Sequence, residues 1–260
     1  MSKFGVKEVM DVTFYDTVTK KPVLFCDTLK LSSLENTADE SDARGGKGNP
    51  KLLTWDFNRS SSMKVQDALL SPKSFSMLSG NAVTKGAATI HMRQSTVWET
   101  VDGVMTNKGV NFPLIASAGG AITLAFTPKE AAADILVYEI SDDGGTPLTA
   151  GTLSGTTLTN VAWANKQVVA YYTYESDASA ETYIITSDKF PSTYKIVGDT
   201  VVRNASTGKD EAFQIIINKA KLKPGFTMEF KSDGDPSVFD MDIEVLKEDA
   251  SSKMITMIKY

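Results

Sequence analysis

The sequence has one cysteine, Cys26, and one histidine, His91, in 260 residues. A single cysteine excludes an internal disulfide, and one cysteine with one histidine cannot form the usual zinc shell. Cys26 lies in the apolar run Val-Leu-Phe-Cys, which favours a small core side chain over a nucleophile. His91 falls on the polar side of an alternating run, where we expect it to be solvated.

Other absences narrow the range of functions that the sequence allows. The catalytic motifs GxSxG, HExxH and GxGxxG do not occur. No apolar run approaches the roughly 20 residues of a membrane span, and the first residues lack the apolar core of a secretory signal. The net charge of −5 argues against a protein that grips nucleic acid, although not against a surface that nucleic acid slides past. We therefore expect no enzyme activity, no cofactor and no membrane partner, and synthesis in a reducing cytoplasm.

The clearest positive feature is the stretch from Glu211 to Leu246, in which apolar and polar residues alternate in three successive runs. Strict period two predicts strands with one buried face. Ser232–Pro236 separates the second and third runs, and its Asp-Gly and proline predict a tight turn. We therefore expect the last two runs to form an antiparallel hairpin; the three strands are residues 213–218, 226–231 and 239–245.

The third run carries a row of carboxylates, Asp240, Asp242 and Glu244, on its polar face. Alternate positions on a strand lie about 6–7 Å apart. That spacing is compatible with a solvated face, a weak calcium site, a catalytic carboxylate pair or an acidic wall that lines a channel. No partner residues for catalysis accompany the row.

The N-terminal third predicts further strands. Met10–Tyr15 alternates, and Val23–Leu31 is apolar on both faces, which predicts a strand that is covered on two sides. Residues 51–66 read as another strand. A short helix follows, because Ser71 suits the N-cap, Pro72 the first turn and Gly80 the end.

Residues 32–50 have no apolar period and predict a long polar loop. Its glycines around Lys47 resemble a phosphate-binding loop, but no Ser or Thr follows the lysine and no helix comes next. We expect instead a loop that contacts a neighbouring subunit. Its candidate contact residues are Asp39, Glu40, Asp42, Arg44 and Lys47.

Between residues 113 and 187 the charges thin out, and short strands recur at roughly ten-residue spacing. This pattern is typical of a small β-sandwich of the immunoglobulin kind. We predict a mainly β protein in which residues 1–112 and 188–260 form one discontinuous domain and residues 113–187 an inserted sandwich. Tyr171, Tyr172 and Tyr174 suit strand packing, with an aromatic carbohydrate platform as the alternative.

The C-terminal run carries the motif F-x-M-x-F…G-D-P…F…V, whose residues are Phe226, Met228, Phe230, Gly234, Asp235, Pro236, Phe239 and Val245. With this motif the run resembles the tail tube proteins of tailed bacteriophages, as does the order of elements in residues 1–112 and 188–260. The tail, Met254 to Tyr260, is apolar and predicts a last strand that pairs with something. The middle segment departs from the simple tube protein and looks like a decorating insertion.

The resemblance implies a fold and a function. It implies a tail-tube β-sandwich or barrel, hexameric rings that share an inner β-barrel, and stacked rings through which the genome passes. The partners would be the chain itself, the tape measure and tail terminator proteins, and DNA only in transit; the location would be the virion tail. Under this reading the carboxylate row would line the lumen and repel phosphate.

Two rival functions remain open on the sequence alone. An Ig-like adhesin or virion decoration module fits the Thr-, Gly- and Ala-rich middle. A carbohydrate-active enzyme would use the carboxylate row, and Asp242 would then be essential. A related ring-shaped protein, such as a secretion-system tube, also stays compatible with the sequence.

Overall fold

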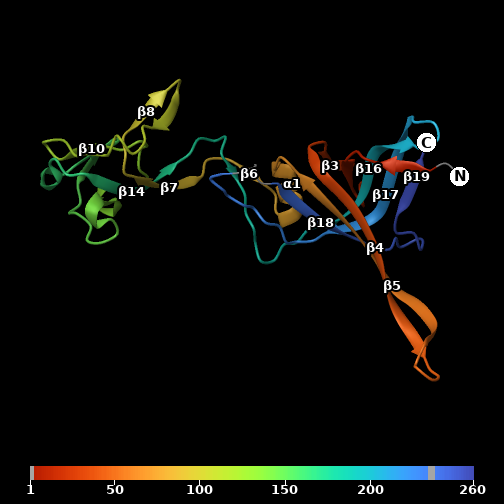
Figure 1. The fold of residues 1–260 in the computed structure, drawn as a ribbon. Coiled ribbons are helices and arrows are strands. Elements are labelled where there is room, and N and C mark those ends of the chain that lie inside the picture. Colours follow the sequence, from red (N-terminus) through yellow and green to blue (C-terminus); the bar gives the residue numbers. More distant parts are fainter. Residues whose placement is uncertain (1–2, 234–237) are drawn as a thin grey trace. The chain divides into compact units, whose positions relative to one another are not determined.

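The computed structural model describes residues 3–233 and 238–260, and their fold is mainly β (Figure 1). The chain divides into two compact units. The first unit combines Met1–Val83 with Tyr183–Tyr260, and the second unit is Thr84–Thr182. The insertion therefore begins earlier in the chain than the sequence predicted: residues 84–112, which we had assigned to the first domain, belong to the second unit.

A single nine-stranded sheet forms the first unit, in the order β3-β2-β16-β17-β18-β5-β4. Two short strands extend it, β1 beside β16 and β19 beside β17. All the pairs are antiparallel. The strands are β1 (Phe4–Val6), β2 (Asp11–Asp16), β3 (Pro22–Cys26), β4 (Leu29–Arg44), β5 (Lys51–Asp67), β16 (Thr193–Asn204), β17 (Asp210–Leu222), β18 (Phe239–Val245) and β19 (Thr256–Lys259).

The two edge strands of this sheet, β3 and β4, are consecutive in the chain and are joined through Asp27 and Thr28. The sheet must therefore curl until its edges approach each other at this corner. The edges do not pair in the described residues, so the sheet stays open rather than forming a closed barrel. Buried side chains that alternate along the strands form the hydrophobic core of this curled sheet. Among them are Val12, Phe14, Met63, Val65, Ile196, Ile217, Leu222, Met241 and Ile243.

The predicted helix is confirmed as α1 (Pro72–Ser79). The Ser71 hydroxyl accepts a hydrogen bond from the backbone N–H of Ser74, whose own hydroxyl accepts from the Ser71 N–H, so a capping box starts the helix. Gly80 ends it in the left-handed conformation, with φ 73°. Met77 and Leu78 pack against the core of the sheet.

The predicted hairpin at the C-terminal end is wrong in part. Phe239–Val245 is a strand, β18, with alternating burial as expected. Residues 226–231 form no strand, because Pro224 and Gly225 interrupt the chain after β17 and because β18 pairs with β17 and β5 instead. The expected turn at Ser232–Pro236 includes residues 234–236, which lie outside the described part of the chain.

The second unit has its own core between two three-stranded sheets, β10-β13-β12 and β11-β14-β7. Residues 84–112 belong here because β7 pairs with β14. The immunoglobulin-like character of this insertion stays a prediction. The elements are β6 (Thr84–Lys85), β7 (Thr89–Gln94), β8 (Trp98–Val101), β9 (Val104–Asn107), β10 (Ala121–Thr123), β11 (Leu136–Glu139), β12 (Thr152–Ser154), β13 (Thr157–Thr159), β14 (Val168–Glu175) and β15 (Glu181–Thr182), with 3₁₀ turns at Ala132–Asp134, Ile140–Asp142 and Val161–Trp163.

Strands near both ends of the chain, β1 and β19, belong to the sheet of the first unit. The predicted last strand is β19, and its partner is β17 of the same chain. No helix in the described residues is long and apolar enough to cross a membrane.

Candidate assembly surfaces

Residues 32–50 are not the irregular loop that the sequence predicted. They belong to a long β-hairpin, in which β4 and β5 pair as far as Arg44 and Lys51. We call its distal part, residues 36–61, the arm. A tight turn closes the arm, with a hydrogen bond from the Gly45 N–H to the Pro50 carbonyl at 3.2 Å. The strand pairing, rather than an apolar face, orders these polar residues.

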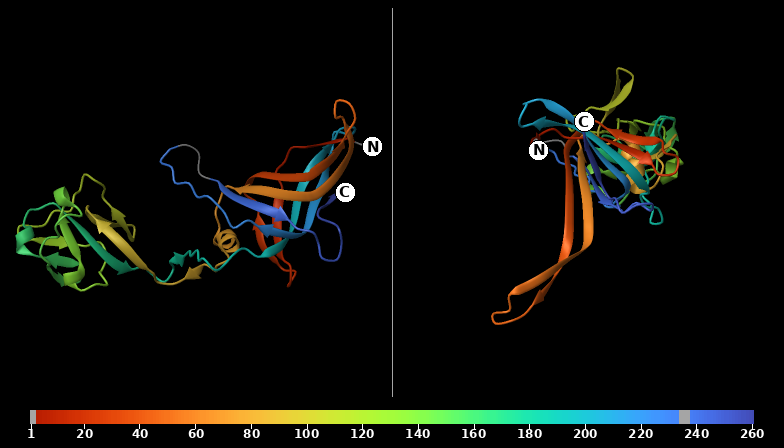
Figure 2. Two further views of the ribbon diagram at one scale, coloured as in Figure 1. Left: turned by 90° about the horizontal axis from the view of Figure 1, so that it is seen from below. Right: turned by 90° about the vertical axis from the view of Figure 1, so that its right-hand side faces the viewer.

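The arm leaves the sheet and projects away from the first unit, as Figure 2 shows most clearly in its right-hand view. The register of the two strands shifts between Thr37 and Asp39, which marks a β-bulge. On the opposite strand Asn58 has φ 48°, a conformation that asparagine tolerates better than most residues. Bulges bend strands, so this irregularity accounts for the change in direction of the ribbon.

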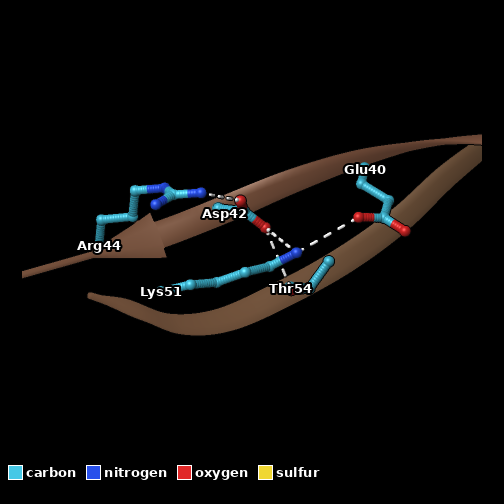
Figure 3. A network of polar contacts seen from close by, with 5 residues as sticks. All are labelled: Glu40, Asp42, Arg44, Lys51 and Thr54. Atoms are coloured by element: carbon cyan, nitrogen blue, oxygen red, sulfur yellow. Dashed lines mark hydrogen bonds and ion pairs between the residues drawn. The ribbon is translucent and has the colours of Figure 1, made fainter. Parts of the chain in front are cut away.

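One face of the arm carries a self-contained charge network (Figure 3). The Lys51 Nζ lies 2.8 Å from the Asp42 Oδ1 and 3.3 Å from the Glu40 Oε2. The Arg44 Nη2 donates to the Asp42 Oδ2 at 3.0 Å, and the Thr54 hydroxyl donates to the Asp42 Oδ1 at 3.1 Å. Glu40, Asp42, Arg44 and Lys51 therefore all have a partner within the arm.

The network shifts the titration of its members. The hydrogen bond from Lys51 lowers the pKa of Asp42 below its usual range, and the same contact raises the pKa of Lys51. Both groups are solvent-exposed, so the energetic value of the pair is small. Its main effect is to fix the polar face of the arm in one arrangement.

The other face of the arm is apolar and uncovered. Leu53, Trp55 and Phe57 alternate along β5 and are 60%, 56% and 46% exposed. Their cross-strand neighbours on β4 are the smaller residues Ala43, Ser41 and Asp39. A continuous apolar row on a projecting hairpin is the kind of surface that marks a protein contact.

The structure thus brings together most of the residues that we had placed in an intersubunit loop. Asp39, Glu40, Asp42 and Arg44 lie on β4 within the arm, and Lys47 lies in its turn. Sequence reasoning missed the apolar row, because its alternation is the same as that of a strand in a core. The signal that could have revealed it is length, since a strand of 17 residues exceeds what one small core can cover.

The carboxylates of β18 lie on the outward face of the sheet, between buried core residues. Asp240 is paired with Lys64 of β5, whose Nζ lies 2.9 Å from the Asp240 Oδ2. Asp242 lines a groove of about 260 Å³ together with Lys64, Lys223 and Glu35. Glu244 is exposed and stands opposite Lys221 of β17.

The face around the row is therefore mixed in charge rather than purely acidic, because lysines of β5 and β17 alternate with the carboxylates. Among the residues that the structure describes, no group of three or more His, Cys, Asp or Glu could hold a metal ion.

Cys26 and His91, the one cysteine and the one histidine, belong to different units. Cys26 is buried at the edge of the core, and burial raises the pKa of its thiol to about 12. His91 is exposed on β7 of the second unit. A thiol with so high a pKa is a poor nucleophile at neutral pH.

A strand-rich unit with a projecting arm and an uncovered apolar row has the features of a structural protein. The chain belongs to the YomU/Tube protein family, whose model matches residues 4–257. This membership confirms the resemblance to phage tail tube proteins and points to a tube-like structural protein of the virion tail. No curated protein matches the chain.

Proposed function

We propose that this chain is the repeating subunit of a phage tail tube, in which subunits close into hexameric rings and the rings stack around a channel for the genome. Family membership over residues 4–257 supports the tube, and the fold supports assembly. A structural role of this kind needs no catalytic group and no cofactor.

The arm is the observation that carries the proposal. Its polar face holds an internal network of Glu40, Asp42, Arg44 and Lys51, while the row Leu53, Trp55 and Phe57 remains exposed. Aromatic side chains bury large areas at interfaces and dominate their energetics. An apolar row held away from the core therefore contributes nothing to folding of the isolated chain, and it gains its stabilising effect when it packs on a neighbouring subunit or ring.

The channel is the second part of the proposal. We place the outward face with Asp240, Asp242 and Glu244 toward the lumen, where carboxylates would repel the phosphates of passing DNA. The lysines among them would moderate this repulsion. The tape measure protein would fill the lumen before ejection, and a tail terminator would end the stack. A tube reconstruction that shows Asp242 on the outer surface would refute this orientation.

Electron microscopy of the purified protein at high concentration tests the assembly. We expect rings or tubes with a central hole. A Trp55→Ser/Phe57→Ser variant should fold normally and stay unassembled, whereas the matched control Val18→Ser, at an 85%-exposed turn position, should assemble like the natural protein. Monomers of the natural protein at every concentration would contradict the proposal.

A decoration or adhesion module is the second candidate, and one observation favours it. The second unit has its own core and its own sheets, so it is a separate folding unit that a tube wall does not require. Binding of glycans or host surfaces by residues 84–182, in a protein that never forms rings, would support this alternative.

A further inference from the structure

One alternation of odd-numbered apolar residues runs through β5 from the arm into the core. Leu53, Trp55 and Phe57 are exposed, whereas Met63 and Val65 are buried. On an uninterrupted strand, residues at even spacing point to the same side. A regular β5 would therefore hold the apolar row on the side of the hairpin that continues the core face of the sheet.

The pairing with β4 shows that the row lies on the other side. Phe57 is opposite Asp39, and Ser60 is opposite Thr37. Between these two pairs β5 contains two residues and β4 contains one, which is the count of a β-bulge. Opposite residues share a side, and Thr37 and Asp39 share one because they are alternate residues of β4. Phe57 therefore lies on the same side as Ser60, away from Met63.

Asn58 is the residue that accommodates this extra step. Its φ is 48°, in the left-handed region that asparagine adopts more readily than β-branched residues do. Its Nδ2 donates to the Asp39 Oδ2 at 3.2 Å, so the side chain also ties the bulge to the opposite strand. At the base of the arm, the hydroxyl of the buried Ser61 donates to the Asn36 Oδ1 at 2.8 Å. The pairing is thus fixed on the sheet side of the bulge.

A hairpin without the bulge would lose its apolar face. Continuing the regular pairing of the base outward would place Phe57 opposite Glu40 and Trp55 opposite Asp42. A shift of one residue moves every side chain of a strand to the other face. The aromatic residues would then stand among the charges of the network instead of on the side of Ser41.

We propose that Asn58 is the positioning residue of the arm, which holds Leu53, Trp55 and Phe57 on the side where a second copy of the chain covers them. The inference rests on the proposed tube function and deepens it, because it assigns the contact surface to one register of the hairpin. Asn58 acts through the register of β4 and β5, and the apolar row makes the contact.

Nuclear Overhauser contacts between backbone protons of dilute subunits test the register. Asn58→Val places a β-branched residue where φ is positive, so the arm should slip and bring Trp55 opposite Asp42 instead of Ser41. Asn58→Gly tolerates the positive φ and should keep Trp55 opposite Ser41. Ser60→Val introduces the same side chain at a regularly paired position and is the control. Natural pairing of Trp55 with Ser41 in Asn58→Val would overturn the inference.

Deletion of Asn58 is a second variant with the opposite expectation. It removes the extra residue, so Arg59 would stand opposite Ala38 and Trp55 would remain opposite Ser41. A deletion variant with Trp55 opposite Asp42 would also overturn the inference. Among the described residues, the core of the first unit contains none from the arm, so all these variants should keep the natural thermal unfolding.

Electron microscopy then connects the register with assembly. Asn58→Val should need at least tenfold more protein than the natural chain to form rings, whereas Asn58→Gly and Ser60→Val should form them at the natural concentration. A slipped Asn58→Val arm that still forms rings at that concentration would overturn the inference and leave the tube function standing. A natural protein that forms no rings would overturn the tube function, while the backbone contacts of the subunit would still decide whether Asn58 sets the register.

Discussion

The Nζ of Lys64 lies 2.9 Å from the Oδ2 of Asp240, across the pair formed by β5 and β18. The second carboxylate oxygen, Oδ1, is buried and has no hydrogen-bond partner in the described residues. The hydrogen bond to Asp240 raises the pKa of Lys64. The lysine is thus the compensating charge for the carboxylate that begins the acidic row.

Removing this compensation should have a small but measurable effect. Both side chains are more than a third exposed, and ion pairs of this kind contribute about 0.2–1 kcal/mol. Lys64→Met should therefore lower the free energy of unfolding by at most about 1 kcal/mol in urea denaturation. Lys30→Met, at an exposed position of β4, is the control and should change nothing. A loss well above 2 kcal/mol would mean that the pair is buried in a way that the geometry excludes.

The charge network of the arm predicts a dependence on pH. The pKa of Asp42 lies below the ordinary value of 3.8, chiefly because Lys51 donates a hydrogen bond to it. A carboxyl group whose pKa is lowered in the folded state stabilises the fold at pH values above its ordinary pKa. This stabilisation is lost as the pH falls through the lowered pKa. The arm should therefore keep its network at neutral pH and lose it only below about pH 4.

Carboxyl NMR titration measures this effect directly. In Lys51→Met the titration of Asp42 should move up toward 3.8, because the largest cause of its low pKa is gone. Lys47→Met, in the turn of the same arm, should leave the titration unchanged. A natural arm in which Asp42 titrates at or above 3.8 would show that the network does not persist in solution.

Local signals in the sequence predicted some of the fold well. The cap at Ser71, the proline after it and Gly80 defined α1 correctly, since these signals act within the helix itself. The alternation of Phe239–Val245 likewise predicted β18 and its buried face. In both elements the local sequence preference and the burial in the core favour the same secondary structure.

The remaining elements depend on partners that local patterns do not identify. Residues 32–44 lack an apolar period, yet they form a strand because β5 pairs with them. Residues 226–230 have the correct period but no strand, because β18 pairs elsewhere. The apolar row at Trp55 follows the same pattern as the buried residues Met63 and Val65, so alternation alone does not distinguish an exposed row from the core.

Gly80 should be among the positions least tolerant of substitution. Its φ is +73°, and an added Cβ would lie 2.6 Å from the carbonyl oxygen of Phe190. Gly80→Ala should therefore combine backbone strain of about 1–2 kcal/mol with a steric clash. Gly208→Ala is a matched control, because Gly208 has φ +67° and open space around it. Thermal denaturation should show the larger loss for Gly80→Ala; equal losses would argue against close packing on Phe190.

Cys26 should be unreactive in the folded protein. Burial raises the pKa of its thiol to about 12, so almost no thiolate exists at pH 8. A thiol-specific chromogenic reagent should react with it only after unfolding in urea. A Val18→Cys variant places a second thiol at an exposed turn and should react at once, which confirms that the reagent is active. Rapid reaction of the natural protein would mean that the edge of the core at β3 opens readily.

The boundaries of the second unit predict that it can be removed. Thr84 of β6 and Thr182 of β15 are cross-strand partners, so the ends of the insertion lie side by side. Joining Val83 to Tyr183 through a short Gly-Ser linker should give a protein that unfolds cooperatively, because the core of the first unit takes no residue from 84–182. If the tube is built from the first unit, the shortened protein should also form rings in electron microscopy. A shortened protein that folds but does not assemble would assign part of the contact between subunits to the second unit.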